Sequence, residues 1–591
     1  MTLQIVRRSN PQPAADLGSA LHPVLRRVYG ARGLRAASEL SLTLDRLLPV
    51  GTLGGVEAAV DLLLQHRQRG TLILVIGDFD ADGATSTALI VRALRAWGYP
   101  AVDFLVPNRF EFGYGLTPEI VALAAVRRPG LIVTVDNGIS SVAGVAAARK
   151  LGIDVLVTDH HLPGAELPAA NAIVNPNVPG NGFATGTLAG VGVAFYVMAA
   201  LRRRLDELGF APAAAPGVAE FLDLVALGTV ADLVPLDVNN RVLVAQGLAR
   251  IRAGRCVAGI RALLELAGKR LGDVSAADLG FVVAPRLNAA GRLDDMSYGI
   301  RCLLADSTAE ASTLAAHLDQ LNRERRTIEA RMQNEALLAV RALRDTAALG
   351  VGAGTRAGAA RIRRGVCLYD PGWHQGVVGL VASRVKDKLR RPVIAFADAG
   401  DGWLRGSARS VPGVHIRDVL DAIAARHPEL ISKFGGHAMA AGLTLAAPAL
   451  DAFADEFDAE VKRWLAGAGD PNLIESDGEL AVEEIALETA EALRAGGPWG
   501  QAFPEPVFDG VFAVRSSRVV GDRHLKLWLE VPGTGRSFDA IAFNLLEPGE
   551  RAPLDSATQA QFVYRLDINE YQGERRLQLL VDHVLAWPPV S

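Results

Sequence analysis

The sequence predicts an α/β protein in which a parallel-sheet domain is joined by a long helix to a second α/β domain and is followed by a C-terminal β-barrel. Three observations carry this prediction. Short apolar runs alternate with helical stretches between about residues 71 and 175, the stretch 306–343 contains neither Gly nor Pro, and several short runs of alternating polarity follow residue 470. Runs that are apolar on both faces and separated by helices indicate a parallel sheet.

Five segments follow in order along the chain. Residues 1–66 are expected to be a helical lead-in, and residues 67–304 the parallel-sheet domain. Residues 305–345 give the connecting helix, residues 346–466 the second α/β domain after a Gly-rich linker at 350–358, and residues 467–591 the barrel. The strands expected in the three domains are 72–76, 102–106, 131–135, 155–158 and 172–174, then 366–369 and 393–397, then 511–514, 525–530, 540–543, 561–566 and 576–581.

Charge and cysteine content limit the class of protein. The 61 basic and 65 acidic residues give a net charge of −4, so any contact with nucleic acid must come from local patches rather than from a global field. The three cysteines, Cys256, Cys302 and Cys367, are far apart, which argues against a disulfide framework and a structural zinc site. We find no signal-peptide pattern or membrane span and expect a cytoplasmic, soluble protein without a membrane partner.

Three carboxylates, Asp78, Asp80 and Asp82, alternate directly after the apolar run 72–76. Packing three like charges together is costly unless a cation neutralises them, and oxygen ligands favour Mg²⁺ or Mn²⁺. An acidic surface turn is one alternative. A calcium loop is another, but that loop needs a Glu at position 89, where this sequence has Leu.

Further acids and two histidines follow other expected strands. Asp136 follows 131–135, and Asp159, His160 and His161 follow 155–158. Ligands of parallel sheets lie outside the carboxyl ends of the strands, so these groups are expected to meet. Asp232 follows an apolar helix. A single acid in such a place is most often a turn or cap residue, whereas adjacent histidines after a buried strand are rarer as packing residues.

The ordered series of these motifs resembles the DHH phosphoesterase superfamily, and within it the RecJ family. The series runs from Asp78-x-Asp80-x-Asp82-Gly83 through Asp136 and Asp159-His160-His161 to Gly228-Thr-Val-Ala-Asp232. The stretches that support it are 107–110, 113–116, 284–292, 372–379, 435–437 and 565–573. The resemblance covers nearly the whole chain from about residue 70. It implies a DHH domain, a DHHA1 domain and an OB-type barrel.

The resemblance implies two divalent ions, Mn²⁺ or Mg²⁺, that share Asp136 as a bridge. Asp78 and Asp80 would complete the first site, and the second would be completed by Asp82, His160 and Asp232. Two ions about 4 Å apart clamp the attacking and leaving oxygens of a phosphoryl displacement. We expect His161 to contact the scissile phosphate. We expect Asp159 to orient a histidine by accepting its ring N–H.

Other residues are expected to hold the substrate. Arg109, Arg286 and Arg292 are candidates for phosphate contacts, with an ordinary salt bridge as the alternative. Ser407 and Arg409 are expected to form a pocket for a 5′-terminal phosphate, with His437 beside it, although Gly435-Gly436-His437 is by itself no more than a turn pattern. The remaining substrate contacts that we expect are Asn288, Trp373 and His374. Trp373 and His374 would stack on a base, and core packing is the alternative for Trp373.

The barrel segment holds the clearest basic patch, with two aromatic residues nearby in the sequence. The patch comprises Arg515, Arg518, Arg523, Lys526, Arg575 and Arg576, and the aromatic residues are Trp528 and Tyr571. A basic patch with aromatic side chains nearby is suited to the binding of a single strand by an OB-fold, although most basic patches are solvated faces.

The function implied is a 5′→3′ exonuclease that degrades single-stranded DNA to 5′-mononucleotides in DNA repair and recombination. The resemblance further implies a monomer that acts with a helicase and a single-strand-binding protein. One rival is a phosphodiesterase of short oligonucleotides or cyclic dinucleotides, or a pyrophosphatase. Those proteins would match only the first two domains. The second rival is a non-catalytic scaffold that binds single strands. Such a scaffold would be expected to lack some of the acids and histidines of the metal site.

Overall fold

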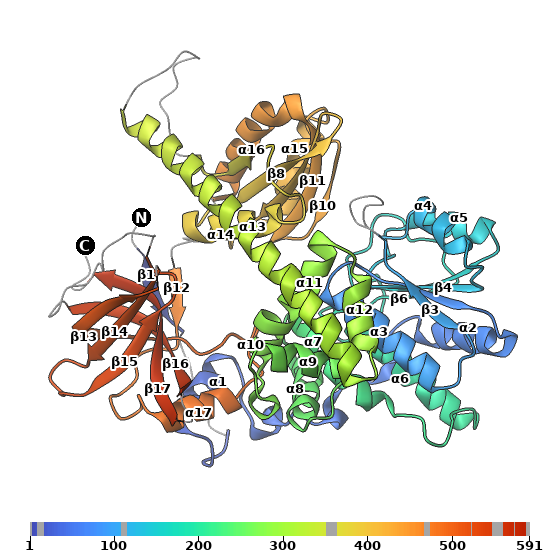
Figure 1. The fold of residues 1–591 in the computed structure, drawn as a ribbon, viewed down its shortest axis with the longest axis horizontal. Coiled ribbons are helices and arrows are strands. Elements are labelled where there is room, and N and C mark those ends of the chain that lie inside the picture. Colours follow the sequence, from blue (N-terminus) through green and yellow to red (C-terminus); the bar gives the residue numbers. More distant parts are fainter. Residues whose placement is uncertain are drawn as a thin grey trace. The chain divides into compact units, whose positions relative to one another are not determined.

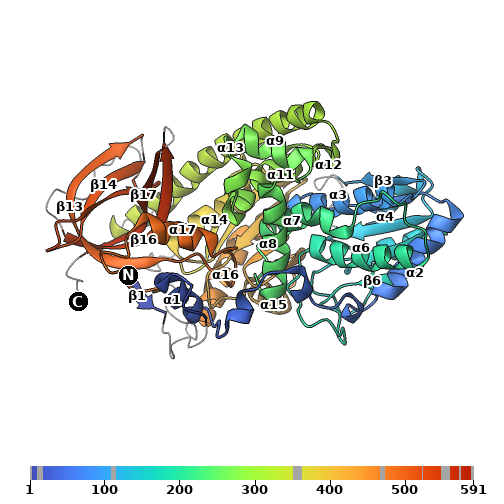
Figure 2. The same cartoon turned by 90° about the horizontal axis from the view of Figure 1, so that it is seen from below.

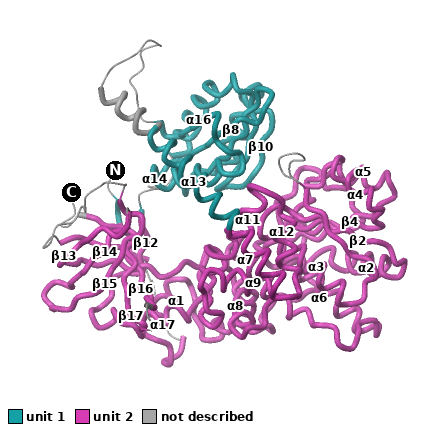
Figure 3. Tube along the Cα trace, in the orientation of Figure 1, with its two compact units in different colours: residues 1–4, 320–473 teal, residues 5–319, 474–591 magenta. Residues whose placement is uncertain are grey.

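The computed structural model describes residues 3–8, 17–107, 115–349, 363–465, 473–521, 523–546, 559–571 and 574–586. Two compact units divide the chain (Figure 3): unit 1 comprises residues 1–4 and 320–473, and unit 2 comprises residues 5–319 and 474–591. The expected linker at 350–358 lies outside the described residues. No single described helix is long and apolar enough to cross a membrane. The described segments Leu44–Thr52 and Val56–Arg69, which are bent by 80° relative to each other, reach that length and apolar composition only when they are counted together.

Unit 2 contains the predicted parallel sheet. Its strands are β2 (Ile73–Ile76), β3 (Val102–Leu105), β4 (Leu131–Val135), β5 (Asp154–Thr158) and β6 (Ala172–Val174). They pair in the order β3-β2-β4-β5-β6, and every pair is parallel. Every residue of β2 and β4 is buried, as expected for strands covered on both faces. The carboxyl ends of all five strands therefore lie along one edge.

Helices cover both faces of this sheet (Figure 1). On one face lie α4 (Pro118–Ala125) and α5 (Val142–Lys150), which bury their apolar residues against Leu74, Ile132 and Val155. On the other face lie α2 (Val56–Arg69), α3 (Ala81–Ala96) and α6 (Gly190–Glu207). The start of α4 is set locally, because Thr117 accepts a hydrogen bond from the amide of Ile120 and Pro118 occupies the first turn.

A helical layer and a long helix follow the sheet. The layer consists of α7 (Leu222–Ala231), α8 (Val238–Arg252), α9 (Ala258–Leu266), α10 (Ala276–Asp278), a π-helical turn (Leu279–Val283), α11 (Ala284–Leu293) and α12 (Ser297–Leu304). The predicted connecting helix is α13 (Thr308–Leu349), whose first residues belong to unit 2 and whose remainder belongs to unit 1.

The N-terminal segment differs from the helical lead-in that the sequence suggested. It begins with a strand, β1 (Gln4–Arg7), which forms a two-stranded sheet with β12 (Leu473–Ser476) before α1 (Pro23–Ala31). Within unit 2, the amide of Arg8 donates to the carbonyl of Ser476 over 2.7 Å, and Arg7 pairs with the buried carboxylate of Asp509. The partner strand lies more than 460 residues away in the chain, so the local sequence pattern could not predict this strand pairing.

Unit 1 contains the second α/β domain. Its strands are β7 (Val366–Tyr369), β8 (Val393–Gly400), β9 (Trp403–Arg409), β10 (Lys433–Gly436) and β11 (Ala440–Ala446), in the order β10-β11-β9-β8-β7. Only β7 and β8 pair in parallel, and the other pairs are antiparallel. The helices are α14 (Val378–Leu389), α15 (Ile416–Arg426) and α16 (Leu450–Leu465), and their core includes Phe396, Phe453 and Phe457.

The predicted barrel is present in unit 2. Five strands, β13 (Phe508–Val520), β14 (His524–Glu530), β15 (Ser537–Ala542), β16 (Gln559–Tyr571) and β17 (Glu574–Ala586), close in the order β13-β14-β15-β17-β16. Side chains of β14 point alternately into and out of the barrel. Leu525, Leu527 and Leu529 are buried inside it, whereas Trp528 is exposed. A short helix, α17 (Leu487–Ala495), precedes the barrel.

Candidate metal centre

Three acids stand at the carboxyl ends of neighbouring strands. Asp78 follows β2, Asp136 follows β4 and Asp159 follows β5, and all three are buried. Asp136 adopts a φ of 58°, in the left-handed region that residues other than glycine seldom occupy. Such strain persists where surrounding contacts enforce it and is concentrated at functional sites.

Two further acids are fixed by helix N-termini. Asp80 caps α3, where its Oδ1 accepts hydrogen bonds from the amides of Asp82 and Gly83 over 2.9 and 3.0 Å. Asp82, which is 1% exposed, accepts from the amides of Gly190 and Val191 over 2.6 and 2.9 Å. These two amides open α6, so the helix dipole favours the negative charge there. Burial and the charge of Asp232 nevertheless raise the pKa of Asp82 to about 7.

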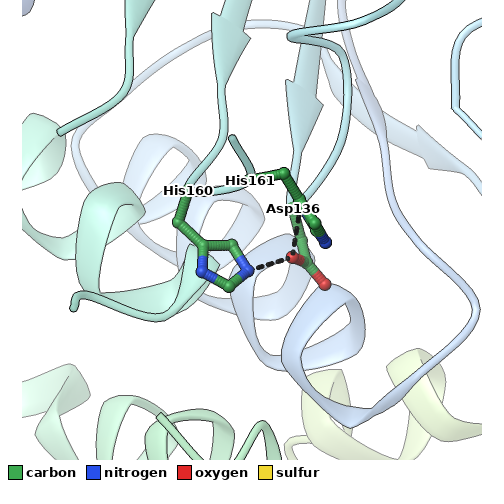
Figure 4. Close-up of side chains that lie close together, drawn as sticks. All are labelled: Asp136, His160 and His161. Atoms are coloured by element: carbon green, nitrogen blue, oxygen red, sulfur yellow. Dashed lines mark hydrogen bonds and ion pairs between the residues drawn. The ribbon is translucent and has the colours of Figure 1, made fainter. Parts of the chain in front are cut away.

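Both adjacent histidines lie beside Asp136 (Figure 4), but each contacts a different second acid. His160 Nε2 lies 3.0 Å from Asp136 Oδ1 and 3.5 Å from Asp232 Oδ2. His161 Nδ1 lies 2.7 Å from Asp159 Oδ1 and 3.9 Å from Asp136 Oδ1. Burial lowers the pKa of His160, which keeps this ring neutral. Burial also opposes the charge on His161, but the hydrogen bond to Asp159 outweighs it and raises the pKa of His161 to about 9.

The loop that carries the histidines is held by contacts that sequence reasoning missed. Asp159 accepts the amides of Ile139, His160 and His161 over 2.9, 2.7 and 3.1 Å, in addition to the predicted ring contact. The side chains of Asn175 and Asn177 donate to the carbonyls of His161 and His160. The signal available was the Asn175-Pro176-Asn177 triplet directly after β6, because Asn after a strand often bonds the backbone of a loop.

The donor atoms form three overlapping groups, each with its atoms within 4.8 Å of one another. The groups are Asp78, Asp80 and Asp136; Asp82, His160 and Asp232; and Asp136, His160 and His161. Carboxylate oxygens with one neutral imidazole suit Mg²⁺ or Mn²⁺. Burial raises the pKa of Asp136 and Asp232 as well as that of Asp82, because a buried carboxylate charge without a counter-charge is unfavourable. Bound cations would supply that counter-charge. The residues present therefore fit divalent cations, and Asp136 belongs to two of the three groups.

Two glycines make room for these acids. A Cβ atom at Gly190 would lie 2.8 Å from Asp136 Cβ, and one at Gly228 would lie 2.8 Å from Asp82 Oδ1 and 2.3 Å from Thr85 Oγ1. Helices α6 and α7 can approach the acids only because side chains are missing at these two positions.

Two substrate residues predicted in unit 2 have other partners. Arg286 donates from Nε to Asp319 over 2.9 Å and from Nη1 to the carbonyl of Val282, so it forms the salt bridge named as the alternative to a phosphate contact. Asn288 accepts the amide of Ala81 over 2.8 Å, so it positions the loop of Asp80 and Asp82 instead of presenting its carbonyl to substrate. Arg292 lies in the last turn of α11. Arg109 lies outside the described residues.

In unit 1 the predicted phosphate residues do come together. Arg409 Nη1 donates to Ser407 Oγ over 3.0 Å on β9. A Cβ atom at Gly379, in the first turn of α14, would lie 2.8 Å from both Ser407 Oγ and Arg409 Nη2, so this helix N-terminus faces both side chains. His437 precedes β11, and its amide donates to the carbonyl of Ala440, the residue opposite Arg409. Gly379 was missed, although the sequence stretch that contains it was recognised.

Trp373 and His374 precede α14 and differ in their surroundings. Trp373 is 6% exposed, and its indole N–H donates to Glu335 Oε2 of α13 over 2.9 Å. The prediction that this ring stacks on a base was therefore wrong, because core packing covers it. His374 is partly buried, its Nδ1 accepts the amide of Gly376, and burial lowers its pKa.

The predicted basic patch of the barrel is largely neutralised. Arg515 pairs with Glu530, Lys526 with Asp539, Arg575 with Glu491 and Arg576 with Glu574. Arg518 of β13 remains exposed, and so do two aromatic side chains. Trp528 is 46% exposed and Phe543 is 56% exposed, with the ring of His524 5.2 Å from that of Phe543. The side chain of Tyr571 lies outside the described residues.

Comparison with known proteins gives three domain matches. Residues 72–229 match the DHH family, N-terminal domain, residues 362–463 match the DHHA1 domain, and residues 476–583 match the RecJ OB domain. These matches agree with the predicted fold class. The crystal structure of RecJ in complex with Mn²⁺ from Thermus thermophilus superposes with a TM-score of 0.78 at 30% identity, covering 99% of this chain and 79% of that chain. The Mg²⁺ complex from the same organism gives a TM-score of 0.72.

Curated relatives match from end to end. The single-stranded-DNA-specific exonuclease RecJ of Dickeya dadantii is 52% identical over 98% of this chain and 99% of its own length. The protein of the same name from Escherichia coli is 51% identical over 99% of each chain. Identity of this extent along both chains, with the three domain matches in the expected order, confirms the resemblance read from the motifs: the chain belongs to the RecJ family.

Proposed function

We propose that this protein is a metal-dependent exonuclease that degrades single-stranded DNA in the 5′→3′ direction and releases 5′-mononucleotides. The observation that carries the proposal is the set of three donor groups at one sheet edge, two of which include Asp136. Relatives about half identical over the whole chain are single-stranded-DNA-specific exonucleases by name, and structures of the family contain Mn²⁺ or Mg²⁺. The metal roles of the acids and His160 are part of this proposal.

The chemistry follows from the protonation of the two histidines. Divalent cations supply Lewis acidity toward a phosphodiester when they are bound. His160 is neutral and so offers a lone pair as a ligand, together with Asp82 and Asp232. His161 carries a proton at neutral pH because Asp159 accepts from its Nδ1, so it is suited to contact the negatively charged scissile phosphate. The chain thus uses one imidazole as a ligand and the other as a cation.

The end preference is assigned to unit 1. Ser407 and Arg409 converge at the N-terminus of α14, and a helix N-terminus with an arginine and a hydroxyl makes a site for a phosphate group. His437 and His374 lie on the same domain as further substrate contacts. In the proposed division of labour, residues 67–304 carry the catalysis, residues 346–466 recognise the 5′ end, and residues 467–591 bind the strand.

Two rival functions are weaker. A phosphodiesterase for short oligonucleotides or cyclic dinucleotides would leave the barrel without a use, whereas residues 476–583 match the RecJ OB domain. A non-catalytic scaffold would not need the complete set of donors. Action in DNA repair and recombination, in the cytoplasm, as a monomer and with a helicase and a single-strand-binding protein as partners, remains part of the proposal.

The test is a cleavage assay with Mn²⁺ on 3′-labelled oligonucleotides, comparing single strand with blunt duplex and 5′-phosphate with 5′-hydroxyl ends. Progressive shortening of the single strand alone, stopped by a chelator, is the expected result. Turnover of dinucleotides or pyrophosphate without cleavage of long strands would move the function to the small-substrate rival. Binding of single strands without any cleavage would favour the scaffold.

A further inference from the structure

The donor group of Asp82, His160 and Asp232 (the Asp232 group) is carried by three segments that are distant in the sequence. Asp82 lies in the first turn of α3, His160 lies just after β5, and Asp232 follows α7. Helices α3, α6 and α7 pack side by side in both views (Figures 1 and 2). Because each member of the group belongs to a different element, a part of the chain that is connected to all three carriers can set the distances within the group.

The turn 185–187, with the sequence Thr-Gly-Thr, is connected to two of these carriers. It lies just before α6, whose first two amides hold Asp82. The carbonyl of Gly186 accepts from Asn177 Nδ2 over 3.1 Å, and the same Nδ2 donates to the carbonyl of His160 over 2.6 Å. A Cβ atom at Gly186 would lie 2.3 Å from Asn177 Oδ1, so the turn comes this close because it has no side chain there.

Asp237 joins this turn to the segment that carries Asp232. Its Oδ2 accepts from the hydroxyls of Thr185 and Thr187 over 2.6 and 2.8 Å. Its Oδ1 caps α8 by accepting the amide of Asn240 over 2.8 Å. The chain between Asp232 and Asp237 is short, so the carboxylate of Asp237 fixes the far end of the segment on which Asp232 lies.

A second side chain holds the same turn. Asn240 Nδ2 donates to the carbonyl of Thr187 over 2.7 Å and to the carbonyl of Pro235 over 2.9 Å. Pro235 belongs to the segment that follows Asp232, so this segment and the turn are joined through two side chains. Asn240 is 0% exposed, and a hydrogen bond shielded from water is stronger than one at the surface.

A plain helix cap would not need this arrangement. Capping of α8 uses one oxygen of Asp237. The other oxygen has two hydroxyl donors that lie 50 and 52 residues earlier in the chain. These two hydrogen bonds contribute nothing to the cap, and they join two segments that each lead to a member of the Asp232 group.

We infer that Asp237 and the turn 185–187 act together as a positioning network for the metal site of the Asp232 group. The network acts through the backbone segments that carry the ligands. Loss of an outer partner that orients metal ligands typically weakens metal binding by about 10- to 100-fold. The inference rests on the proposed function and adds to it the residues that decide how tightly one of its two cations is held.

The test is a calorimetric titration of the metal-free protein with Mn²⁺. The main variant is T185V/T187V, because valine keeps the shape of threonine and removes the hydroxyl. T185S/T187S keeps both hydroxyls and serves as the rescue. The matched control is T313V, since Thr313 is an exposed threonine of α13 whose hydroxyl donates to the carbonyl of Ala309 on its own helix.

One of the two Mn²⁺ sites should weaken by about 10- to 100-fold in T185V/T187V, while the other keeps its wild-type affinity. T185S/T187S and T313V should bind both ions as the wild type does. Cleavage by T185V/T187V should be lost at low Mn²⁺ and recover as Mn²⁺ is raised, with KM for the strand unchanged. A general loosening of the fold would instead weaken both sites, and added Mn²⁺ would not restore one of them selectively.

The variant H160A identifies which site is affected. It removes a ligand of the Asp232 group, so adding T185V/T187V to it should cause no further loss of Mn²⁺ affinity. Two changes that act on one site are not additive, whereas changes at independent sites add. Additive losses would show that the turn 185–187 acts elsewhere and would overturn the inference.

Unchanged Mn²⁺ affinity in T185V/T187V would also overturn it, and so would an equal loss at both sites or the same loss in T185S/T187S. If the double variant does not fold, T185V alone serves, because Asp237 then keeps the hydroxyl of Thr187. Failure of the proposed function would look different. The wild type would then bind Mn²⁺ without cleaving DNA, and the titration would still decide the role of the network. A wild type that binds no Mn²⁺ would overturn both.

Discussion

At the scale of single residues, the two adjacent histidines differ because each one faces a different partner. His160 is buried among carboxylates that need cations, so its neutral ring is the useful form. His161 donates to Asp159, whose own carboxylate is held by three amides, so the proton stays on the ring. In the proposed site, a two-residue sequence would therefore provide a metal ligand and a cation.

The residue with the largest expected effect is Asp136, the acid common to two of the three donor groups. In Asp136→Asn the shape is kept but the charge that would bridge two cations is lost. Cleavage should fall by at least about 10³-fold, since metal-ion stabilisation supplies several kcal/mol and each 1.36 kcal/mol is a factor of ten. The measurement is the single-turnover rate together with strand binding by fluorescence anisotropy.

Binding should be retained in that variant. Asp206→Asn is the matched control, because Asp206 is an exposed partner of Arg202 on α6. Retained cleavage in Asp136→Asn would refute the bridging role.

Arg409 is expected to act on the end of the strand and not on the reaction. Arg409→Gln should raise KM for a 5′-phosphorylated strand roughly tenfold to 100-fold, the range that a charge-assisted hydrogen bond supplies, and leave KM for a 5′-hydroxyl strand unchanged. Arg363→Gln is the control, since Arg363 is an exposed arginine of the same unit that pairs with Asp455. Loss of Mn²⁺ affinity in Arg409→Gln would count against a separate end pocket.

At the scale of elements, helix N-termini place the acids and the residues of the proposed phosphate pocket. The start of α3 is capped by Asp80, and the first amides of α6 hold Asp82. In unit 1, the first turn of α14 faces Ser407 and Arg409. Helices α3 and α6 turn unsatisfied amides toward a carboxylate, and the first turn of α14 would offer amides to the proposed phosphate.

Gly190→Ala tests the fit of α6 against the acids. The new Cβ atom would lie 2.8 Å from Asp136 Cβ and 3.0 Å from Asp82 Oδ2, so α6 must move away. We expect a loss of about 1–3 kcal/mol in the free energy of unfolding, as for other overpacked sites, together with weaker Mn²⁺ binding in a calorimetric titration. Gly51→Ala is the control because nothing lies within 4 Å of its Cβ position. Equal Mn²⁺ affinity in the two variants would contradict the prediction.

At the scale of the whole molecule, the cluster of buried acids couples stability to pH and to cations. Without cations, burial raises the pKa of Asp82 and Asp232 to about 7, above the ordinary value of 3.8. Between these values the folded chain keeps protons that the unfolded chain has lost. The free energy of unfolding therefore falls as pH rises toward 7. Bound cations take the place of those protons.

Chelated protein is accordingly expected to lose more stability between pH 5 and pH 8 than the Asp232→Asn variant, in which one of these acids is absent. Mn²⁺ should raise the Tm of the wild type more at pH 8 than at pH 5, because the ligands are charged and uncompensated at the higher pH. Thermal melts with and without chelator at the two pH values measure both effects. The same pH dependence in both proteins would show that these acids do not dominate it.

The sequence by itself determined the order of domains and the chemical character of the metal site. Apolar runs such as residues 131–135 fold where they were expected because strand and helix periods are local properties. Asp78, Asp136 and Asp159 were found because each follows a strand, and parallel strands end at one edge. The alternation in the last domain likewise predicted the barrel, whose strands are longer than the patterns suggested.

Only the tertiary structure decided which charged groups remain available. Arg286 and most of the basic patch are committed to acids, and Trp373 is covered by α13, because side-chain partners come from segments distant in the chain. The pairing of β1 with β12 depends on the same long-range contacts. The exposed Leu233 and Phe281 were likewise invisible to periodicity, which assigns apolar residues to a core. Local patterns determine elements, whereas exposure and charge pairing are properties of the packed chain.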